Sequence, residues 1–253
     1  MARILRSETS LQRRQRAIVR ELSLRKPLRW AIWCLTIALL VWGACHAWRT
    51  GTWIGLVLSG FAVLCAAGYE VHLREIVAEH RNLEGGRRGE RRMAERLAEQ
   101  LANDHIIIND LDFRIAHERF QIDHLVLAPS AIYIIESKFW AGTLSGDIRD
   151  TQWLQSRANG RGRSVKSPVL QAERQRRMFI AQQTTNIPDD RIYALAVFTH
   201  PAVQLNITGT QNQEKVFRVQ DAIRFINDRC FDPPILTPDQ LQQLADTIIR
   251  RQA

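Results

Sequence analysis

The strongest hydrophobic pattern of the chain lies near its N-terminus. Residues 30–48 and 52–69 contain no Asp, Glu, Lys or Arg, and three residues separate the two runs. As helices rising ~1.5 Å per residue, they would be about 27–29 Å long, close to the ~30 Å hydrocarbon core of a bilayer. A three-residue connection returns the second helix alongside the first. The sequence therefore predicts a transmembrane helical hairpin over residues 30–71.

A helical pattern continues after the hairpin. Residues 72–85 predict a polar helical linker that ends at Gly85-Gly86, and the next helix carries an apolar stripe that includes Met93, Ala94, Leu97, Ala98 and Leu101. Glu90 lies on the same stripe. A carboxylate on a buried face must be paired, hydrogen-bonded or bound to a cation. Glu90 also suits the first turn of a helix as an ordinary acidic residue, so this helix alone leaves two interpretations open.

Three strands are predicted next, at residues 105–110, 121–129 and 131–139. The second and third are joined by Pro129-Ser130, which predicts an antiparallel hairpin. Pairing across this turn joins residues whose numbers sum to about 259, so Asp123 is expected opposite Glu136. On one face of the sheet, their Cβ atoms would be roughly 5 Å apart, and the two carboxylates would repel each other unless a cation lay between them.

The end of the third strand is unusual for a buried segment. Because side chains alternate along a strand, Glu136 and Lys138 share the face of Ile134. Hard divalent cations such as Mg²⁺ prefer carboxylate oxygens, and a neighbouring ammonium can orient the attacking water or stabilise developing charge. Asp123, Glu136 and Lys138 supply these parts. The alternative is a surface salt bridge at a strand end, since Glu-x-Lys is a common sequence.

The remaining pattern completes an α/β domain. It predicts a buried strand at 191–200, a short strand at 215–219, and helices that begin at Pro168, near residue 220 and after Thr237. Ser167 and Thr237 are the capping residues of two of these helices. The expected fold is a mixed β-sheet flanked by helices, formed by one domain that extends from residue 86 to the C-terminal helix.

The net charge of +9 is distributed unevenly along the chain. Residues 1–29 contain nine Lys or Arg and two Glu, so this basic tail carries +7 and the remainder only +2. The high pI is therefore no evidence that the main domain binds nucleic acid. Four arginines follow the second span, whereas the short loop carries one, so both termini are expected in the cytoplasm, at a bacterial-type inner membrane. A cleaved signal sequence does not fit, because a second span follows at once.

Five separate blocks of the sequence resemble one known family. They are "GERRMAERL", "FQIDHLVLAPSAIYIIESKFW", the following "AGTLSG", a Trp at position 153, and "SPVLQAERQ". In order and spacing they resemble the nuclease-related domain, NERD, over about residues 86–200. That family is similar to the PD-(D/E)XK endonuclease-like superfamily, so the resemblance implies a restriction-endonuclease-like fold. Residues 201–253 would then be a C-terminal extension of the same domain.

The resemblance also implies roles for particular residues. Asp123 and Glu136 match the metal ligands, Lys138 matches the catalytic lysine, and Glu90 matches the acidic residue of the helix. Gln121 and Gln171 match positions near the site. The implied cofactor is Mg²⁺ or Mn²⁺. Where the family has Asn before Pro, this chain has Ser167, which keeps a helix-capping role but has no side-chain amide.

Basic residues in two neighbouring segments are candidates for binding the phosphates of nucleic acid. The first segment, expected as a mobile loop, contains Arg157, Arg161, Arg163 and Lys166, and the second, a helix, contains Arg174 and Arg177. Phosphate contacts of this kind hold nucleic acid without reading its sequence. The alternative is a solvated loop and a solvated helix face, because no aromatic residues interleave to stack on bases. His124 is expected to face away from Asp123 as a core residue.

The function predicted from these features is that of a membrane-anchored, metal-dependent nuclease. Its partners would be the lipid bilayer and nucleic acid, with DNA ahead of RNA. A catalytically silent nucleic-acid-binding or protein-interaction module on the same fold is the main alternative, and a scaffold that acts through its membrane hairpin is a third. Lys138 favours the enzyme, since a binding module has no need of a lysine beside the metal ligands.

Overall fold

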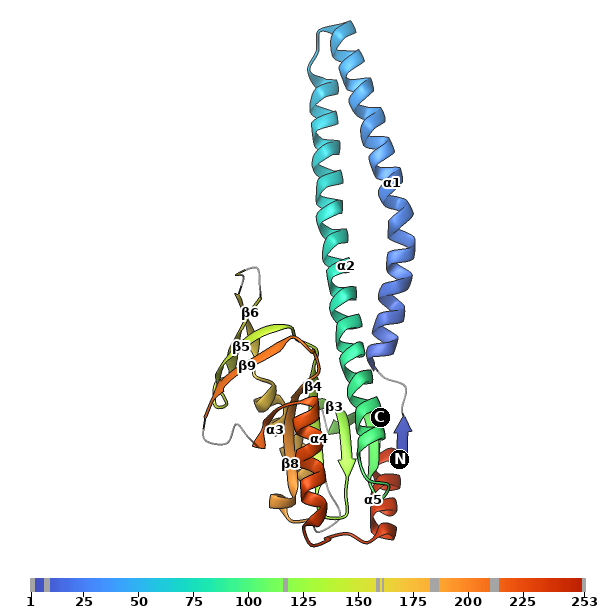
Figure 1. Ribbon diagram of the computed structural model, residues 1–253. Coiled ribbons are helices and arrows are strands. Elements are labelled where there is room, and N and C mark those ends of the chain that lie inside the picture. Colours follow the sequence, from blue (N-terminus) through green and yellow to red (C-terminus); the bar gives the residue numbers. More distant parts are fainter. Residues whose placement is uncertain are drawn as a thin grey trace. The chain divides into compact units, whose positions relative to one another are not determined.

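The computed structural model describes residues 3–6, 10–115, 118–157, 160, 162–182, 187–209 and 214–251 (Figure 1). The chain forms two compact units. One consists of residues 10–84, and the other comprises residues 85–253 together with the N-terminal segment that contains strand β1 (Arg3–Arg6). Each unit has its own packing and is described separately.

The first unit is a helical hairpin formed by α1 (Ser10–Thr50) and the first part of α2 (Ile54–Gln100). The helices approach closely at two glycines, where a Cβ atom on Gly43 would lie 2.5 Å from the carbonyl oxygen of Gly55. The Ser59 hydroxyl donates a hydrogen bond of 2.7 Å to the Leu39 carbonyl of the other helix. Small residues and interhelical hydrogen bonds of this kind are typical of membrane helix pairs.

Both helices of the hairpin are long and apolar enough to cross a membrane, judged by length and composition. In the most apolar stretch of each, only 11% and 17% of the residues are buried, which distinguishes them from the core helices of a soluble domain. The side chains of Trp30, Trp48 and Trp53 are exposed near the ends of the apolar runs, as aromatic belts would require. Helix α1 begins well before the apolar run, so part of the basic tail is helical, which the sequence did not predict.

Helix α2 continues without a break into the second unit. The sequence predicted that the linker helix would end at Gly85-Gly86, and this was wrong. Each glycine weakens a helix interior by ~1 kcal/mol relative to alanine, but the Glu and Arg residues on both sides are good helix formers. The last four turns of α2 also pack on the domain core through Met93 and Leu97, which are fully buried.

The second unit is built on a six-stranded sheet with the order β1-β2-β3-β4-β8-β10. Besides β1, its strands are β2 (Ile106–Ile115), β3 (Glu118–Leu127), β4 (Ile132–Lys138), β8 (Ile192–Phe198) and β10 (Val216–Arg218). Strand β3 is antiparallel to both of its neighbours, β2 and β4, whereas the pairs β1–β2, β4–β8 and β8–β10 are parallel. The sheet is therefore mixed, as the sequence predicted.

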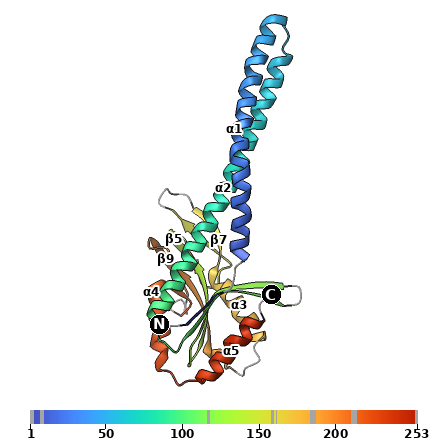
Figure 2. The ribbon, with the colours of Figure 1, turned by 90° about the vertical axis from the view of Figure 1, so that its right-hand side faces the viewer.

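Helices cover both faces of this sheet. Helices α3 (Pro168–Gln182) and α5 (Pro238–Arg250) pack on the face that bears Leu125 and Ile134. The end of α2 and helix α4 (Val219–Asp228) pack on the other face, over Val126 and Ile135. Figure 2 shows α4 and α5 on opposite sides of the sheet. This arrangement confirms the predicted α/β class, and the alternation of apolar side chains along β3 and β4 accounts for both cores.

The predicted β3–β4 hairpin is confirmed in position and in register. The pairs run from His124 with Ile135 to Leu127 with Ile132, and the residue numbers of each pair sum to 259. The strand β8 and the helices α3, α4 and α5 also lie where the sequence placed them. At the start of α5, Thr237 and Gln240 form a capping box, in which each side chain accepts a hydrogen bond from the other residue's backbone N–H.

A second, four-stranded sheet was not predicted. Its order is β7-β6-β5-β9, with β5 (Gly142–Asp147), β6 (Gln152–Ser156), β7 (Gly162–Lys166) and β9 (Val203–Thr208). Leu144, Trp153 and Val203 bury its inner face against Phe198. The segment expected to be a mobile basic loop therefore contains strand β7, which pairs with β6. The sequence predicted one mixed sheet, whereas the structure has two, one of six strands and one of four.

Candidate active site

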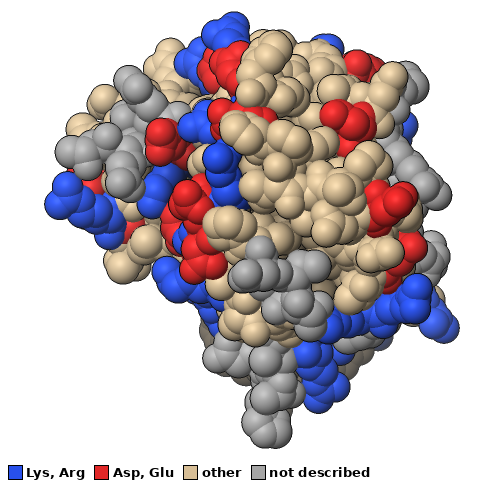
Figure 3. Space-filling model, turned by 90° about the horizontal axis from the view of Figure 1, so that it is seen from below, with Lys and Arg blue, Asp and Glu red and all other residues tan. Residues whose placement is uncertain are grey.

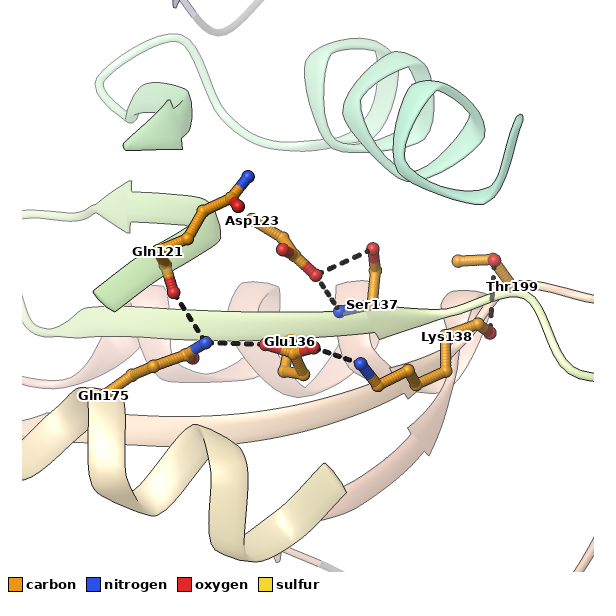
Figure 4. Close-up of polar contacts among 7 residues, drawn as sticks. All are labelled: Gln121, Asp123, Glu136, Ser137, Lys138, Gln175 and Thr199. Carbon is orange, nitrogen blue, oxygen red and sulfur yellow. Dashed lines mark hydrogen bonds and ion pairs between the residues drawn. The ribbon is translucent and has the colours of Figure 1, made fainter. Parts of the chain in front are cut away.

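The candidate site forms where the hydrogen-bonded ladder between β3 and β4 ends. The last pair of that ladder is His124 with Ile135. Beyond it, the Asp123 side chain takes the place of a backbone partner: its Oδ2 accepts hydrogen bonds from the Ser137 N–H (2.8 Å) and the Ser137 hydroxyl (3.3 Å). Asp123 is thus fixed to β4 by its carboxylate. Its partner there, Ser137, directly follows Glu136 (Figure 4).

Glu136 is only 2% exposed, and both of its carboxylate oxygens are engaged. Lys138 forms an ion pair with Oε1, and the Gln175 side chain donates a hydrogen bond of 2.6 Å to Oε2. The same Gln175 amide donates to the Gln121 carbonyl at 2.7 Å, so it bridges β3 and β4 from helix α3 (Figure 4). Glu136 and Lys138 therefore lie together, as the alternation along the strand predicted.

Gln175 is a site residue that the sequence reasoning missed. The resemblance had pointed to Gln171, which lies one helical turn earlier on α3 and is exposed, whereas Gln175 is 4% exposed. The only signal in the sequence was the four-residue spacing, which places Gln171 and Gln175 on the same face of the helix. Gln121 is half-buried, and it is its backbone carbonyl that Gln175 contacts.

Glu90 reaches the same cluster from helix α2. Burial raises its pKa to about 7, and the nearby Asp110 and Glu136 carboxylates contribute in the same direction. The helix approaches the sheet closely at the preceding residue: a Cβ atom on Gly89 would lie 2.6 Å from Thr199 Oγ1 and 2.7 Å from Phe139 Cβ. The lack of a side chain at Gly89 therefore allows Glu90 to come close to the carboxylates of the sheet.

Asp110 is a second residue that the sequence reasoning missed. It lies in β2. The β2–β3 pairs before and after it have the same register, so its position in the strand is opposite that of Asp123. Its φ of 60° is rare for a non-glycine residue, although Asp tolerates it better than most. This local distortion interrupts the alternation of the strand and turns Asp110 toward Glu90. No periodic pattern in the sequence could have indicated it.

The charges of the cluster are strongly interdependent. Burial raises the pKa of Asp123 well above its usual value, and the Glu136 and Glu90 carboxylates raise it further. Burial alone would lower the pKa of Lys138, but Glu136, Asp123 and Glu90 together raise it, so Lys138 remains a cation. Three carboxyl groups, those of Glu136, Asp123 and Glu90, thus act on the Lys138 ammonium, and Asp110 acts on Glu90. The raised pKa values of Glu90 and Asp123 are those expected where negative charge exceeds the positive charge nearby.

His124 lies apart from this chemistry, as predicted. Its ring is buried, and Nδ1 lies 2.7 Å from the Asn109 amide oxygen. Burial lowers its pKa to about 3, so the imidazole is neutral in the folded domain. His124 is therefore a core residue.

The donor set suits a hard divalent cation, because it consists of carboxylate oxygens with excess negative charge. Asp123 and Glu136 belong to adjacent strands, the Glu90 carboxylate raises the pKa of Asp123, and Glu136 raises that of Glu90. Within the described part of the chain, however, no three His, Cys, Asp or Glu side chains are already arranged as a ligand cluster. Glu136 would have to exchange at least part of its contact with Lys138 or Gln175 to bind an ion.

The predicted phosphate-binding residues lie on strand β7, just after strand β6 and on helix α3. Arg163 and Lys166 are on β7, and Arg163 donates a hydrogen bond of 2.7 Å to Gln155, whereas Arg157 is exposed after β6. Arg174 and Arg177 are exposed on α3. Arg161 lies outside the described residues. On the face shown in Figure 3, charged side chains lie mostly around a broad uncharged area, with acidic and basic side chains mixed at the upper left and basic side chains gathered at the lower right.

We expect Glu90→Gln to stabilise the metal-free protein at alkaline pH. A carboxyl whose folded pKa is raised destabilises the fold above that pKa, and this cost disappears as pH falls toward its unfolded value. Gln carries no charge to desolvate, so the variant should gain about 1–3 kcal/mol at pH 8 in EDTA and lose most of that advantage by about pH 5. Denaturant unfolding at both pH values measures this.

The matched control is Glu95→Gln on the same helix. Glu95 is exposed and forms a surface ion pair with Arg91, so its replacement should change stability by less than about 0.5 kcal/mol. Equal stability of the Glu90→Gln variant and the parent at pH 8 would contradict the half-buried position of Glu90 beside Asp110 and Glu136.

Comparison with known proteins agrees with the resemblance inferred from the sequence. Residues 85–199 match the model of a protein family described as the nuclease-related domain, NERD. No curated protein and no solved structure matches the chain. The matched segment is less than half of the chain, but it contains Glu90, Asp110, Asp123, Glu136 and Lys138. The whole carboxylate–lysine cluster therefore lies in the segment that is similar to the nuclease-related domain.

Proposed function

We propose that the protein is a membrane-anchored, metal-dependent nuclease that hydrolyses phosphodiester bonds. The observation that carries this proposal is the cluster of Glu90, Asp123 and Glu136 around Lys138, with Asp110 beside Glu90, in a segment that matches the nuclease-related domain. Excess negative charge with raised pKa values is costly in a buried site, and clusters of this kind are typical of functional sites. A divalent cation would remove the cost and supply the chemistry of the PD-(D/E)XK type.

Asp123 and Glu136 would hold Mg²⁺ or Mn²⁺, and Glu90 would bind it through water or directly. When bound, such an ion polarises a phosphoryl oxygen and lowers the pKa of a bound water. Lys138 stays protonated beside Glu136 and can orient the attacking water or stabilise charge on the phosphate. Gln175 donates a hydrogen bond from α3 to the Glu136 carboxylate and so holds it in place. Gln121 and Gln171, the latter one helical turn from Gln175, would lie around these ligands without binding the ion.

The substrate class that fits is nucleic acid, with DNA ahead of RNA. Arg163 and Lys166 on β7, Arg157 just after β6, and Arg174 and Arg177 on α3 offer cations to a phosphate backbone. Such contacts give affinity that falls steeply with salt and does not depend on sequence. The apolar hairpin would anchor the domain in a plasma membrane, with both termini on the cytoplasmic side because the basic residues flank that end of the spans.

A catalytically silent module on the same fold is the second candidate. It is favoured by one observation: Lys138 and Gln175 already satisfy both oxygens of Glu136, which is how a structural ion pair would look. A silent module would bind nucleic acid or a protein partner without needing a cation.

The deciding experiment uses the full chain, purified in detergent or reconstituted in lipid vesicles. We expect it to cleave plasmid DNA or a long RNA with Mg²⁺ or Mn²⁺ and to stop when EDTA is added. Parallel binding measurements at increasing salt separate affinity from cleavage. Binding without cleavage in either metal would support the silent module, and cleavage that persists in EDTA would contradict a metal-dependent centre.

A further inference from the structure

A second chemical constellation lies outside the carboxylate–lysine cluster, where the start of β2 meets the end of α4. The Cys230 thiol lies 3.6 Å from Nε2 of His105, and Nδ1 of the same ring lies 2.7 Å from the Asp104 carboxylate. The His105 side chain is fully buried, whereas Cys230 is exposed. A nucleophile (Cys230) therefore contacts a base (His105), and the base contacts a group that can orient it (Asp104).

The contacts select a particular tautomer of His105. A carboxylate accepts hydrogen bonds but does not donate them, so the ring proton lies on Nδ1 and points to Asp104. This leaves the lone pair of Nε2 directed at the Cys230 sulfur, in the arrangement needed to take the thiol proton. The thiol proton has a second acceptor, the Ile226 carbonyl at 3.7 Å, one turn earlier in the chain.

The surroundings of Cys230 are those of a protonated thiol with an adjacent base. Burial raises its pKa, and the Asp104 and Asp228 carboxylates act in the same direction. The resting group is therefore a thiol, and reaction depends on proton transfer to His105. The Tyr133 hydroxyl is buried and has no hydrogen-bond partner among the described residues, and Cys230 is one of the groups that raise its pKa.

We propose that Cys230 is a nucleophilic thiol, activated by His105 and Asp104, that is oxidised by peroxides. The thiol proton passes to Nε2 as the sulfur attacks one peroxide oxygen. The O–O bond breaks, and the departing oxygen takes the proton from the imidazolium and leaves as water. Sulfur is oxidised to a sulfenic acid, and hydrogen peroxide is reduced. Cys230 is the only cysteine of residues 85–253, so the product persists or passes to an external thiol.

Two acidic neighbours of Cys230 allow a test in which the direction of the change in oxidation rate distinguishes activation by His105 from simple electrostatics. Asp104 and Asp228 both raise the pKa of the thiol, but only Asp104 contacts His105. Electrostatics alone predicts that removing either charge speeds oxidation, because thiolate forms more readily. Activation by His105 predicts that Asp104→Asn slows oxidation at least about fivefold, because Asn no longer holds the required tautomer, whereas Asp228→Asn leaves the rate equal or higher.

The measurement uses the full chain treated with hydrogen peroxide and dimedone, with the dimedone adduct on the Cys230 peptide quantified by mass spectrometry over time. Both aspartates are exposed, so neither variant is expected to unfold. His105→Gln should slow the reaction as Asp104→Asn does. The proposal would be overturned if the Asp104→Asn variant were labelled as fast as the parent or faster.

Discussion

Replacing Glu136 with Gln is expected to reduce cleavage by at least about 100-fold and to destabilise the metal-free protein by about 1–3 kcal/mol. Cleavage is lost because an amide is a poor ligand for a hard cation. Stability is lost because Glu136 accepts hydrogen bonds from Lys138 at one oxygen and from Gln175 at the other. A Gln side chain has one oxygen, so its amide NH₂ must face one of these donors.

A competing effect works against this loss of stability. Removing the Glu136 charge relieves repulsion with Asp123 and Glu90, whose pKa values Glu136 raises. The mismatch outweighs the relief, because Lys138 is largely buried and loses its nearest anion. Unfolding in EDTA and cleavage in Mg²⁺, measured on the same preparation, separate the two consequences.

The matched control is Glu173→Gln on helix α3. Glu173 forms an ion pair of 2.8 Å with Lys215, and both side chains are partly exposed. This variant should lose less than about 1 kcal/mol and keep full cleavage. Should Glu136→Gln cleave like the parent, Glu136 is not a ligand of a catalytic ion. Should it lose stability while the parent never cleaves, the Glu136–Lys138 pair is structural.

Local periodicity was sufficient to predict the parts of the site that depend on it. The short turn at Pro129-Ser130 set the register of β3 and β4, and two-residue alternation placed Glu136 and Lys138 on one face. The helical period placed Glu90 on the buried stripe of α2. Each of these inferences uses residues close together in the sequence, where geometry leaves few choices.

The same reasoning failed where geometry depends on a local exception or on tertiary packing. Asp110 enters the cluster through a positive φ that breaks the alternation of β2. Gln175, rather than Gln171, reaches Glu136 because the rotation of α3 against the sheet is set by packing residues such as Ala172 and Phe179, which are buried. The ladder also ends at His124, so Asp123 bonds to the backbone of Ser137 and is not a simple cross-strand partner of Glu136.

The second sheet illustrates a different limit. Its central strand β5 pairs in parallel with β9, so that Gly142 lies beside Val203 and the strands are separated by more than fifty residues. Strands of this sheet are short and rich in Ser, Thr, Gln and Gly, which gives a weak β signal. The pairing itself, together with burial of apolar side chains such as Trp153, Leu144 and Val203, stabilises them. A sequence window that covers one strand does not contain this information.

Gly89→Ala is expected to destabilise the protein by about 1–3 kcal/mol and to reduce cleavage about tenfold. An alanine Cβ at this position would lie 2.6 Å from Thr199 Oγ1 and 2.7 Å from Phe139 Cβ. The Thr199 side chain can rotate, but the Cβ of Phe139 is fixed to the backbone just after β4. Helix α2 must therefore move outward, which takes Glu90 away from Glu136 and Lys138.

The control for this change lies three residues earlier in the same helix. A Cβ atom on Gly86 meets no atom within 4 Å, so Gly86→Ala should stabilise the helix by up to about 1 kcal/mol and leave cleavage unchanged. The two substitutions are chemically identical and share the gain in helix propensity, so opposite signs in denaturant unfolding isolate the contact at Gly89. If Gly89→Ala stabilises the protein as Gly86→Ala does, α2 does not approach β4 closely enough to hold Glu90 in the cluster. The acidic helix residue would then have no part in the site.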